Sequence, residues 1–261
     1  MIYLGNSPVG IVGKVPLPYD IPKKDDGNAY VYVYLTNPND LDARIYISSS
    51  NPAGTYTVDW GDGNTETAGG SAYIDHTYQK TGFYTVKLTV ITGTPRLGGS
   101  GNTWLMGGGS SERPIYQYKL MGLETGDWGI ASQEFADYSN SIAIYARRCP
   151  YLAYSALNAR SCKALSTLEL PAIASNYASY QFNGCFGIKE VTIPKEVTNI
   201  GSYVFRDCGI ISFHMESSTP PTLGSGAFNG CEVTIYVPTG SLTTYQAAEN
   251  WSTYANNMVE E

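Results

Sequence analysis

Apolar and polar residues alternate in four short runs near the amino terminus, each bounded by Asn, Pro, Gly or Asp. The runs cover residues 30–36, 43–49, 55–60 and 84–90. A period of two residues places successive side chains on opposite faces of a strand. Several short antiparallel strands at this spacing predict a β-sandwich over residues 27–93.

A different pattern begins in the second half of the chain, where a phrase ending in cysteine returns at a fixed interval. The phrase reads YASYQFNGC, IGSYVFRDC and LGSGAFNGC, and its cysteines, Cys185, Cys208 and Cys231, lie 23 residues apart. Counting back by 23 residues reaches Cys162. Repeats of about 20–29 residues are one strand and a return segment that bury little alone. The period therefore predicts a mainly β chain whose residues 113–238 form a solenoid of about five coils.

An aromatic side chain precedes each of the three cysteines by three residues, namely Phe182, Phe205 and Phe228. Stacked coils bring equivalent side chains to about 5 Å from one another, the spacing of neighbouring parallel strands. We therefore expect one internal ladder of phenylalanines and another of cysteines. Spaced aliphatic and aromatic residues after the cysteines predict the strands: Leu165, Leu168 and Leu170; Ile188, Val191 and Ile193; Ile211, Phe213 and Met215.

The same register extends towards the amino terminus. Phe135, Tyr138, Ile142 and Ile144 occupy the places of the aromatic residue, the cysteine and the strand in a further coil. Before them, residues 115–120 alternate between apolar and polar types. This alternation predicts the first strand of the solenoid.

The repeated pattern F-x-x-C-x-x-(I/L)-x-x-(V/L)-x-(I/L)-P, with I-G-S-x-x-F opening the next coil, resembles the BspA-like leucine-rich repeats of bacterial surface proteins. Residues 220–258 resemble the way such arrays end. The resemblance covers about the C-terminal half of the chain and implies a leucine-rich-repeat solenoid. Two coils depart from the pattern. Ala159 stands in the aromatic position before Cys162, and the strand after Cys208 is shifted by one residue to Ile211, Phe213 and Met215.

The cysteines have two interpretations. Reduced, buried thiols fit the period, because free cysteine is among the most buried residue types. A disulfide framework or a metal site is the alternative, but the count of five is odd and no C-x-x-C pair occurs. We therefore interpret Cys162, Cys185, Cys208 and Cys231 as reduced and buried, with Cys149 as the fifth cysteine.

A second group of motifs lies in the predicted sandwich. The motifs are V-D-W-G-D-G, H-T-Y and G-F-Y-T-V, and their characteristic residues are Trp60, Asp62, Gly63, His76, Tyr78, Gly82 and Tyr84. Over residues 28–91 they resemble a polycystic kidney disease (PKD) domain. The resemblance implies an immunoglobulin-like sandwich that acts as a spacer or a binding module.

The polar residues of these motifs have a catalytic alternative, with Asp59 and Asp62 as paired carboxylates and His76 as a base. A structural role is favoured, because Asp62-Gly63 is a strong hairpin signal and Trp60 would fill the core. Calcium bound by Asp59, Asp62 and Asp75 is a further possibility. The chain lacks a D-x-D-x-D loop, so no metal site is predicted.

Three segments flank or join the two patterned regions. Residues 1–26 hold four prolines, which favour extended backbone, and are predicted to form a short strand and an arm. Residues 94–112 are rich in Gly and Ser, which predicts a linker whose Trp104 and Met106 cover the first coil. Residues 239–261 show a helical period that predicts a C-terminal cap.

The net charge and the composition limit the classes of molecule that the protein is expected to bind. The 261 residues carry a net charge of −7, which argues against nucleic acid because its binding depends on clustered Lys and Arg. No apolar run is long enough for a transmembrane helix, and Met1 is followed by no basic and apolar export signal. Charged residues make up only 15%, whereas tyrosine occurs 22 times. Such a surface favours contact with proteins or glycans.

No catalytic constellation is visible, and no cofactor is predicted. The two histidines, His76 and His214, fall in different predicted regions, and no Ser or Cys has a nucleophile context. We therefore expect a non-enzymatic protein of the bacterial surface or extracellular space that binds a host or bacterial protein or glycan through its repeats. Residues 1–93 and 113–261 are expected to fold separately.

The alternative function is a structural component of a phage-like particle, located in the virion. It depends on the opening I-Y-L-G-N-x-P-V-G, which resembles the start of proteins encoded in gut-bacterial prophages and surface loci.

Overall fold

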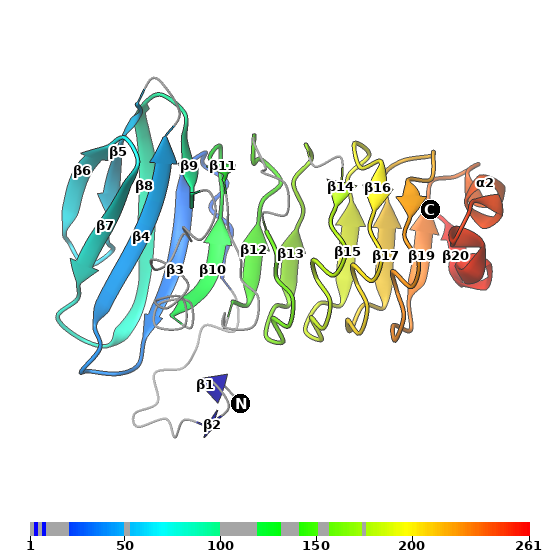
Figure 1. Ribbon diagram of the computed structural model, residues 1–261, viewed down its shortest axis with the longest axis horizontal. Coiled ribbons are helices and arrows are strands. Elements are labelled where there is room, and N and C mark those ends of the chain that lie inside the picture. Colours follow the sequence, from blue (N-terminus) through cyan, green and yellow to red (C-terminus); the bar gives the residue numbers. More distant parts are fainter. Residues whose placement is uncertain are drawn as a thin grey trace.

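The computed structural model describes residues 21–49, 53–99, 119–131, 141–150, 157–173 and 176–261, and the backbone of two short paired strands, β1 (Tyr3–Leu4) and β2 (Ser7–Pro8). The protein is mainly β, with 40% strand and 6% helix. A β-sandwich lies at one end, and a row of stacked coils leads from it to a small helical cap at the other (Figure 1). The predicted fold class is confirmed.

The sandwich is built from two sheets, and four of its strands lie at the predicted positions. One sheet contains β3 (Ala29–Leu35), β8 (Gly82–Thr92), β5 (Thr55–Asp59) and β6 (Thr65–Gly69), and the other contains β4 (Asp42–Ser49), β7 (Ala72–Thr77), β9 (Pro95–Leu97) and β11 (Gly129–Ile130). The predicted strands are β3, β4, β5 and β8, and the pairs of the sandwich are antiparallel except that β11 pairs parallel with β9. Val31, Val58 and Ile45 are fully buried between the two sheets. The strand β9 lies beyond residue 93, so the sandwich extends into the segment interpreted as a linker.

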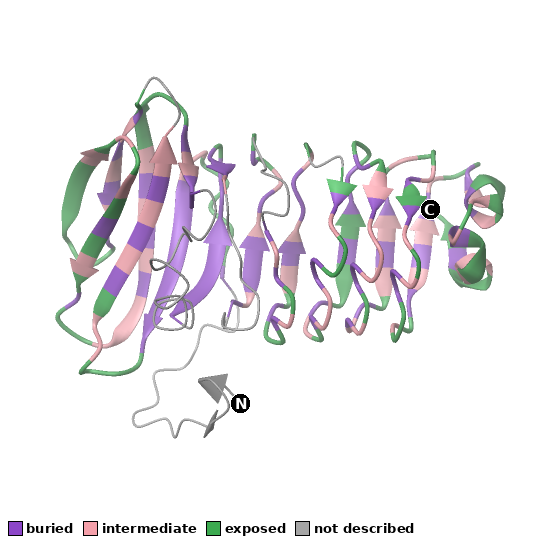
Figure 2. Ribbon diagram, viewed as in Figure 1, coloured by how far each residue is buried: buried purple, intermediate pink, exposed green. Residues whose placement is uncertain are grey.

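The sandwich and the first coils share one hydrogen-bonded sheet. Strand β10 (Leu120–Glu124) pairs antiparallel with β3 and parallel with β12 (Ala143–Tyr145), which pairs parallel with β13 (Thr167–Glu169). The result is a seven-stranded sheet in the order β13-β12-β10-β3-β8-β5-β6. Because β3 is covered on both faces, every one of its residues is buried, as Figure 2 shows.

The later coils form two further parallel sheets. The larger contains β15 (Glu190–Ile193), β17 (Ser212–Met215), β19 (Thr234–Val237) and β20 (Met258–Glu260). The smaller contains β14 (Asn176–Tyr177), β16 (Asn199–Ile200) and β18 (Thr222–Leu223), which lie 23 residues apart along the chain. The solenoid has about five turns over residues 122–260.

The interior of the solenoid contains both expected rows of side chains. The ring centroids of Phe182 and Phe205 lie 5.4 Å apart, and those of Phe205 and Phe228 lie 6.0 Å apart. Cys208 donates from Sγ to the carbonyl oxygen of Phe182 at 3.0 Å, and Cys231 to that of Phe205 at 3.1 Å. Each thiol thus bonds to the backbone of the preceding coil, which satisfies a buried donor.

The five cysteines are free thiols, but Cys231 is only half-buried. The expectation of a buried side chain is wrong at this position. Cys231 is the last cysteine of the row, and the helical cap follows it where another coil would otherwise cover the thiol. The other four cysteines, including Cys149, are buried.

Two positions have left-handed backbone in each of four consecutive coils. They recur every 23 residues, as Leu157, Tyr180, Tyr203 and Gly226, and as Ser161, Gly184, Asp207 and Gly230, with φ between 55° and 79°. Glycine adopts this conformation freely, whereas other residues pay a steric cost. The repeat therefore imposes the same two turns even where the residue type does not favour them.

The coil that follows Cys208 has the predicted one-residue shift of its strand, and Phe213 and Met215 are buried as expected. Val191 pairs with Phe213, 22 residues further on, so one residue is missing after Cys208. Ile210 takes the interior place, and Ile211, predicted to point inwards, is 57% exposed. The strand predicted over residues 115–120 is seen only as β10, which begins at Leu120; the earlier part lies outside the described residues, as do Trp104, Met106, Phe135 and Tyr138.

The C-terminal cap contains the predicted helical turns in two pieces, α2 (Leu242–Ala247) and the 3-10 helix η1 (Trp251–Asn257). Asn250, between them, has φ of 62°, which interrupts the helix. Trp251 donates from its ring nitrogen to the carbonyl oxygen of Pro221 at 2.7 Å. Tyr245 donates from its hydroxyl to Ser217 at 2.7 Å. Both side chains fix the cap against the last coils.

Candidate functional site

The polar motif residues of the sandwich bond to one another and to nearby backbone. His76 Nε2 lies 2.8 Å from Asp62 Oδ2, and the His76 ring stacks on Trp60 at 4.7 Å. Trp60 donates from its ring nitrogen to Glu66 at 2.7 Å, and Tyr78 donates to the carbonyl oxygen of Trp60 at 3.0 Å. These contacts join the two sheets of the sandwich at one end.

The charge of Asp62 is stabilised within this cluster. Burial raises the pKa of the Asp62 carboxyl, but hydrogen bonds from His76 and Asn64 outweigh burial and bring the pKa below its usual value. A carboxylate in such a network is already occupied by donors. The arrangement therefore supports a structural role for the Asp62-Gly63 turn, which joins β5 to β6.

The aspartates considered for calcium do not converge. Asp59 Oδ1 accepts from the Gly61 amide at 2.9 Å, and Asp75 accepts from Arg44 at 2.6 Å. Over the described residues, no group of three or more His, Cys, Asp or Glu side chains could hold a metal ion.

The repeat sheet presents a polar outer face. Alternate side chains of β15, β17 and β19 point away from the core, and we call this surface the outer face: Glu190, Thr192, Ser212, His214, Thr234 and Tyr236. Their register places Thr192, His214 and Tyr236 in one row across the strands. Side chains from several coils are thus available side by side to a ligand.

His214 is held at the centre of the outer face. Its ring stacks on Tyr236 at 4.5 Å, and its Nδ1 lies 2.9 Å from the Glu261 carboxylate. Glu190 lies 3.7 Å from the other ring nitrogen. The two carboxylates orient the imidazole, so the row from β15 to the C-terminal residue is one connected polar surface.

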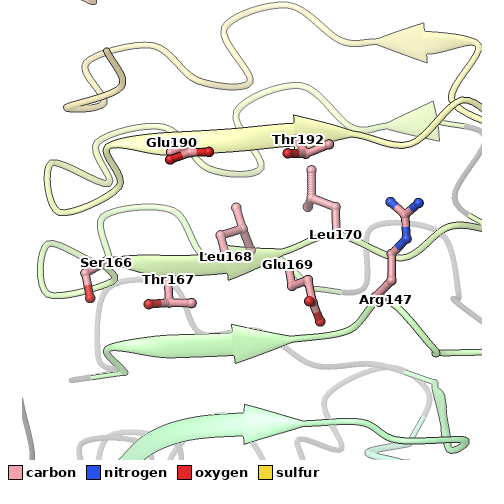
Figure 3. Close-up of a pocket in the computed structure, with 8 residues that line it drawn as sticks. All are labelled: Arg147, Ser166, Thr167, Leu168, Glu169, Leu170, Glu190 and Thr192. Carbon is pink, nitrogen blue, oxygen red and sulfur yellow. The ribbon is translucent and has the colours of Figure 1, made fainter. Parts of the chain in front are cut away.

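A cavity of about 310 Å³ lies at the amino-terminal side of the outer face. Its lining comes from β13, β15 and the turn after β12: Arg147, Ser166, Thr167, Leu168, Glu169, Leu170, Glu190 and Thr192 (Figure 3). Strands β13 and β15 are neighbours in the coil stack, yet they belong to different sheets. Within the described residues no hydrogen bond joins these two strands.

The break in the ladder is local. On the loop side, the same two coils are joined by hydrogen bonds from Ala159 N to Gln181 O and from Ser161 N to Asn183 O, both 2.8 Å. Cys185 also donates from Sγ to the carbonyl oxygen of Ala159 at 3.0 Å. The coils therefore remain stacked while their strand edges stay unbonded, and the cavity lies over this break.

Charged side chains surround the cavity in pairs. Arg147 makes two bonds of 2.9 Å to the Glu216 carboxylate, which raise the pKa of the guanidinium. Lys23 bonds to Glu169 Oε1 at 2.9 Å. Glu169 Oε2 is buried, with no hydrogen-bond partner in the described structure. Glu190 is 71% exposed. The hydrogen-bond acceptors that remain available in the cavity are therefore mainly carboxylate oxygens, which carry negative charge.

Residues 21–25, which we call the strap, form one border of this region. Glu124 is buried and accepts from the amides of Lys24 and Asp25 at 2.8 and 2.6 Å. Tyr145 donates to the carbonyl oxygen of Ile21 at 2.7 Å. The strap thus lies across β10 and β12 and brings Lys23 to Glu169.

Comparison with known families fits both halves of the molecule. A model of the BspA type leucine rich repeat region matches residues 130–246 in six copies, and a model of the PKD domain matches residues 36–100. The chain joins a PKD domain to BspA-type leucine-rich repeats. Domains of both kinds are typically non-catalytic, and BspA-type repeat proteins are typically associated with the cell surface. A search of curated proteins gave no match.

The PKD–repeat protein was also compared with the requirements for a membrane-spanning helix. Among its described residues, no helix is long and apolar enough to cross a membrane. The matched PKD region extends to residue 100 and therefore includes β9, as the sheet pairing does.

The site residues named from the sequence lie in the sandwich and in the two interior rows of the solenoid, and the cavity residues were missed. Thr192 and Glu190 could have been found, because they alternate with the buried Val191 and Ile193 in a predicted strand. Glu169 alternates in the same way with Leu168 and Leu170, whereas Arg147, in the turn after β12, gave no comparable signal. The break between β13 and β15 also had no local signal, because it depends on pairing between distant residues.

Proposed function

We propose that the protein is a non-enzymatic adhesion or binding protein at a bacterial surface, and that its outer face engages a surface protein or glycan. The observation that supports this most is the outer face itself, a connected row of polar and aromatic side chains across β15, β17 and β19. Equivalent positions in successive coils allow weak contacts to add along the sheet.

The PKD domain serves as a rigid base in this proposal. Its polar motif groups, Asp62, His76 and Trp60, bond to partners within the domain. Its shared sheet with the first coils holds the repeats in a fixed direction. A role in a phage-like particle rests on the resemblance of the opening I-Y-L-G-N-x-P-V-G alone.

The experiment compares two matched variants of the intact chain. Thr234→Arg places a bulky charge on the outer face, and Thr222→Arg makes the same change on the exposed edge of the small sheet. Beads coated with each protein are tested for retention on a glycan array and on immobilised extracellular matrix proteins. We expect Thr234→Arg to abolish retention and Thr222→Arg to preserve it. Equal retention by both variants would contradict the proposal.

A further inference from the structure

We propose that the cavity over the break between β13 and β15 is a saccharide subsite that binds one neutral pyranose unit of a glycan. This inference deepens the proposed function by naming the ligand class and the residues that recognise it. It depends on four features of the cavity: its size, its polar groups, its apolar floor and its charge.

The size suits one small ligand unit. Ligand pockets range from about 300 to 1,000 Å³, and the cavity, at about 310 Å³, lies at the lower limit. It is also open to solvent along the outer face, because Glu190 and Thr192 are exposed. A single sugar ring can therefore enter while the rest of a chain continues over the sheet.

The polar groups call for a ligand that brings hydrogen-bond donors. Glu169 lines the cavity, and its carboxylate, which bonds to Lys23 through Oε1 at 2.9 Å, can accept a further hydrogen bond. Thr167 and Thr192 add hydroxyls that both donate and accept. Ser166 already donates to Ile142 O at 3.1 Å and retains acceptor capacity. Sugar hydroxyls complement such a set, because each can donate to a carboxylate and accept from a threonine.

The apolar side chains of the cavity suit the C–H groups of a sugar ring. Leu168 and Leu170 line it from β13 and the residue after it, and both are buried. In Figure 3 they lie between the two strands, where the ladder is open. A pyranose presents C–H groups between its hydroxyls, so one molecule can satisfy both the leucines and the carboxylates.

The charge around the cavity disfavours the main alternatives. Arg147 is already paired with the Glu216 carboxylate, while Glu169 and Glu190 repel an anionic ligand. Calcium takes six to eight oxygen ligands, and the cavity offers two carboxylates beside a guanidinium. A neutral polyhydroxylated ligand remains the best match.

The test uses saturation-transfer NMR of the intact chain with methyl glucoside, methyl galactoside and methyl mannoside as probes. Three variants are compared with the wild type: Thr192→Tyr, which fills the cavity; Glu169→Gln, which keeps the shape and removes the charge; and Thr222→Tyr, the matched control on the exposed edge of the small sheet. Tyrosine is well tolerated at exposed strand positions, and thermal unfolding verifies that each variant is folded.

We expect at least one neutral pyranoside to give a millimolar signal with the wild type and with Thr222→Tyr. Thr192→Tyr should lose this signal, and Glu169→Gln should weaken it by about tenfold through the lost charge-assisted bond. N-acetylneuraminate should bind more weakly than the neutral probes, and a calcium chelator should change nothing.

Two outcomes would overturn the saccharide subsite: no signal from any neutral pyranoside, or an undiminished signal with Thr192→Tyr. Neither outcome decides the proposed function, because retention on matrix and on glycan surfaces is read separately with Thr234→Arg and Thr222→Arg. If those two variants behave alike while the pyranoside signal follows the cavity variants, the adhesion role of the outer face fails and the subsite stands.

Discussion

Two junctions in the molecule differ in their backbone hydrogen bonding: the junction between the PKD domain and the repeats, and the junction between the strands β13 and β15 of adjacent coils. The strands at the first are bonded and those at the second are not, although the sequence pattern changes only at the first. Between the PKD domain and the repeats, β3 and β10 are joined by an antiparallel ladder, although the two regions differ in pattern. Between two adjacent coils of the same repeat, β13 and β15 are not paired. Domain limits drawn from sequence motifs therefore do not coincide with the limits of the hydrogen-bonded sheets.

The difference has a consequence for stability. A strand edge that is bonded to its neighbour cannot open without losing several backbone hydrogen bonds, whereas an unpaired edge opens at lower cost. The PKD domain with the first coils should thus behave as one unit and the later coils as another. The expected independence of residues 1–93 and 113–261 stays a prediction, and the shared sheet means that separation would expose the edges of β3 and β10.

The largest expected effect tests the later coils. Phe205→Ala removes the middle ring of the phenylalanine ladder and should destabilise the protein by about 3–5 kcal/mol, because the stacked neighbours cannot fill the cavity. Its unfolding by denaturant is followed by circular dichroism.

The matched control is Phe186→Ala, since Phe186 is 53% exposed and its removal should change stability little. If the two substitutions have the same effect, or if Phe205→Ala leaves the midpoint unchanged, the ladder does not stabilise these coils.

A buried ion pair tests the joined boundary. The Lys119 ammonium is 1% exposed and bonds to Asp40 at 2.6 Å and to the carbonyl oxygen of Asp42 at 2.6 Å. Asp40→Ala would leave this charge buried without its anionic partner, at a cost of about 2–4 kcal/mol. Denaturant unfolding should show the loss in the transition that includes the PKD domain.

Asp75→Ala is the control, because the Asp75–Arg44 pair is exposed and worth about 0–1 kcal/mol. Equal losses for the two aspartates would mean that the pair across the boundary contributes no more than a surface pair.

The smallest effect concerns the end of the cysteine row. Burial raises the pKa of the Cys231 thiol to about 11, and Cys231 is the only half-buried cysteine of the five. The reactive thiolate fraction should therefore be small near neutral pH and increase about tenfold per pH unit towards 11. In the native protein, an alkylating reagent should label Cys231 slowly and the other cysteines only after unfolding.

Mass spectrometry of the labelled protein measures this difference, with Cys231→Ala as the control. Native labelling at Cys208 that is as fast as at Cys231 would contradict the placement of Cys208 inside the solenoid.

The features predicted correctly from the sequence are those that follow from a local period, namely the strand positions and the repeated interior side chains. Alternation placed β3, β4, β5 and β8, and the 23-residue period placed Phe182, Phe205 and Phe228 in one row. The exposed Ile211 was missed because one residue is absent after Cys208, and either Ile210 or Ile211 satisfies the apolar pattern. The pairing of β3 with β10 has no local signal, since it depends on residues about 90 positions apart.

The cavity, too, could be predicted only in part, because it depends on pairing between distant residues. Its residues Glu169, Glu190 and Thr192 could be recognised as outward-facing from alternation alone, but the missing ladder between β13 and β15 could not. Arg147 reaches it from a turn after β12, at a position that the repeat pattern does not define.

Hydrogen–deuterium exchange of the intact chain, read by mass spectrometry, tests the continuous and the interrupted ladder together. We expect the amides of β10 and β12 to exchange as slowly as those of β3, because the three strands belong to one sheet. Peptides that contain β13 or β15, each of which is paired along one edge only, should exchange faster than peptides that contain β12 or β17, which are paired along both edges. Fast exchange in β10 and β12 beside a protected β3, with β13 and β15 as slow as their neighbours, would place the break at the domain boundary and contradict the account.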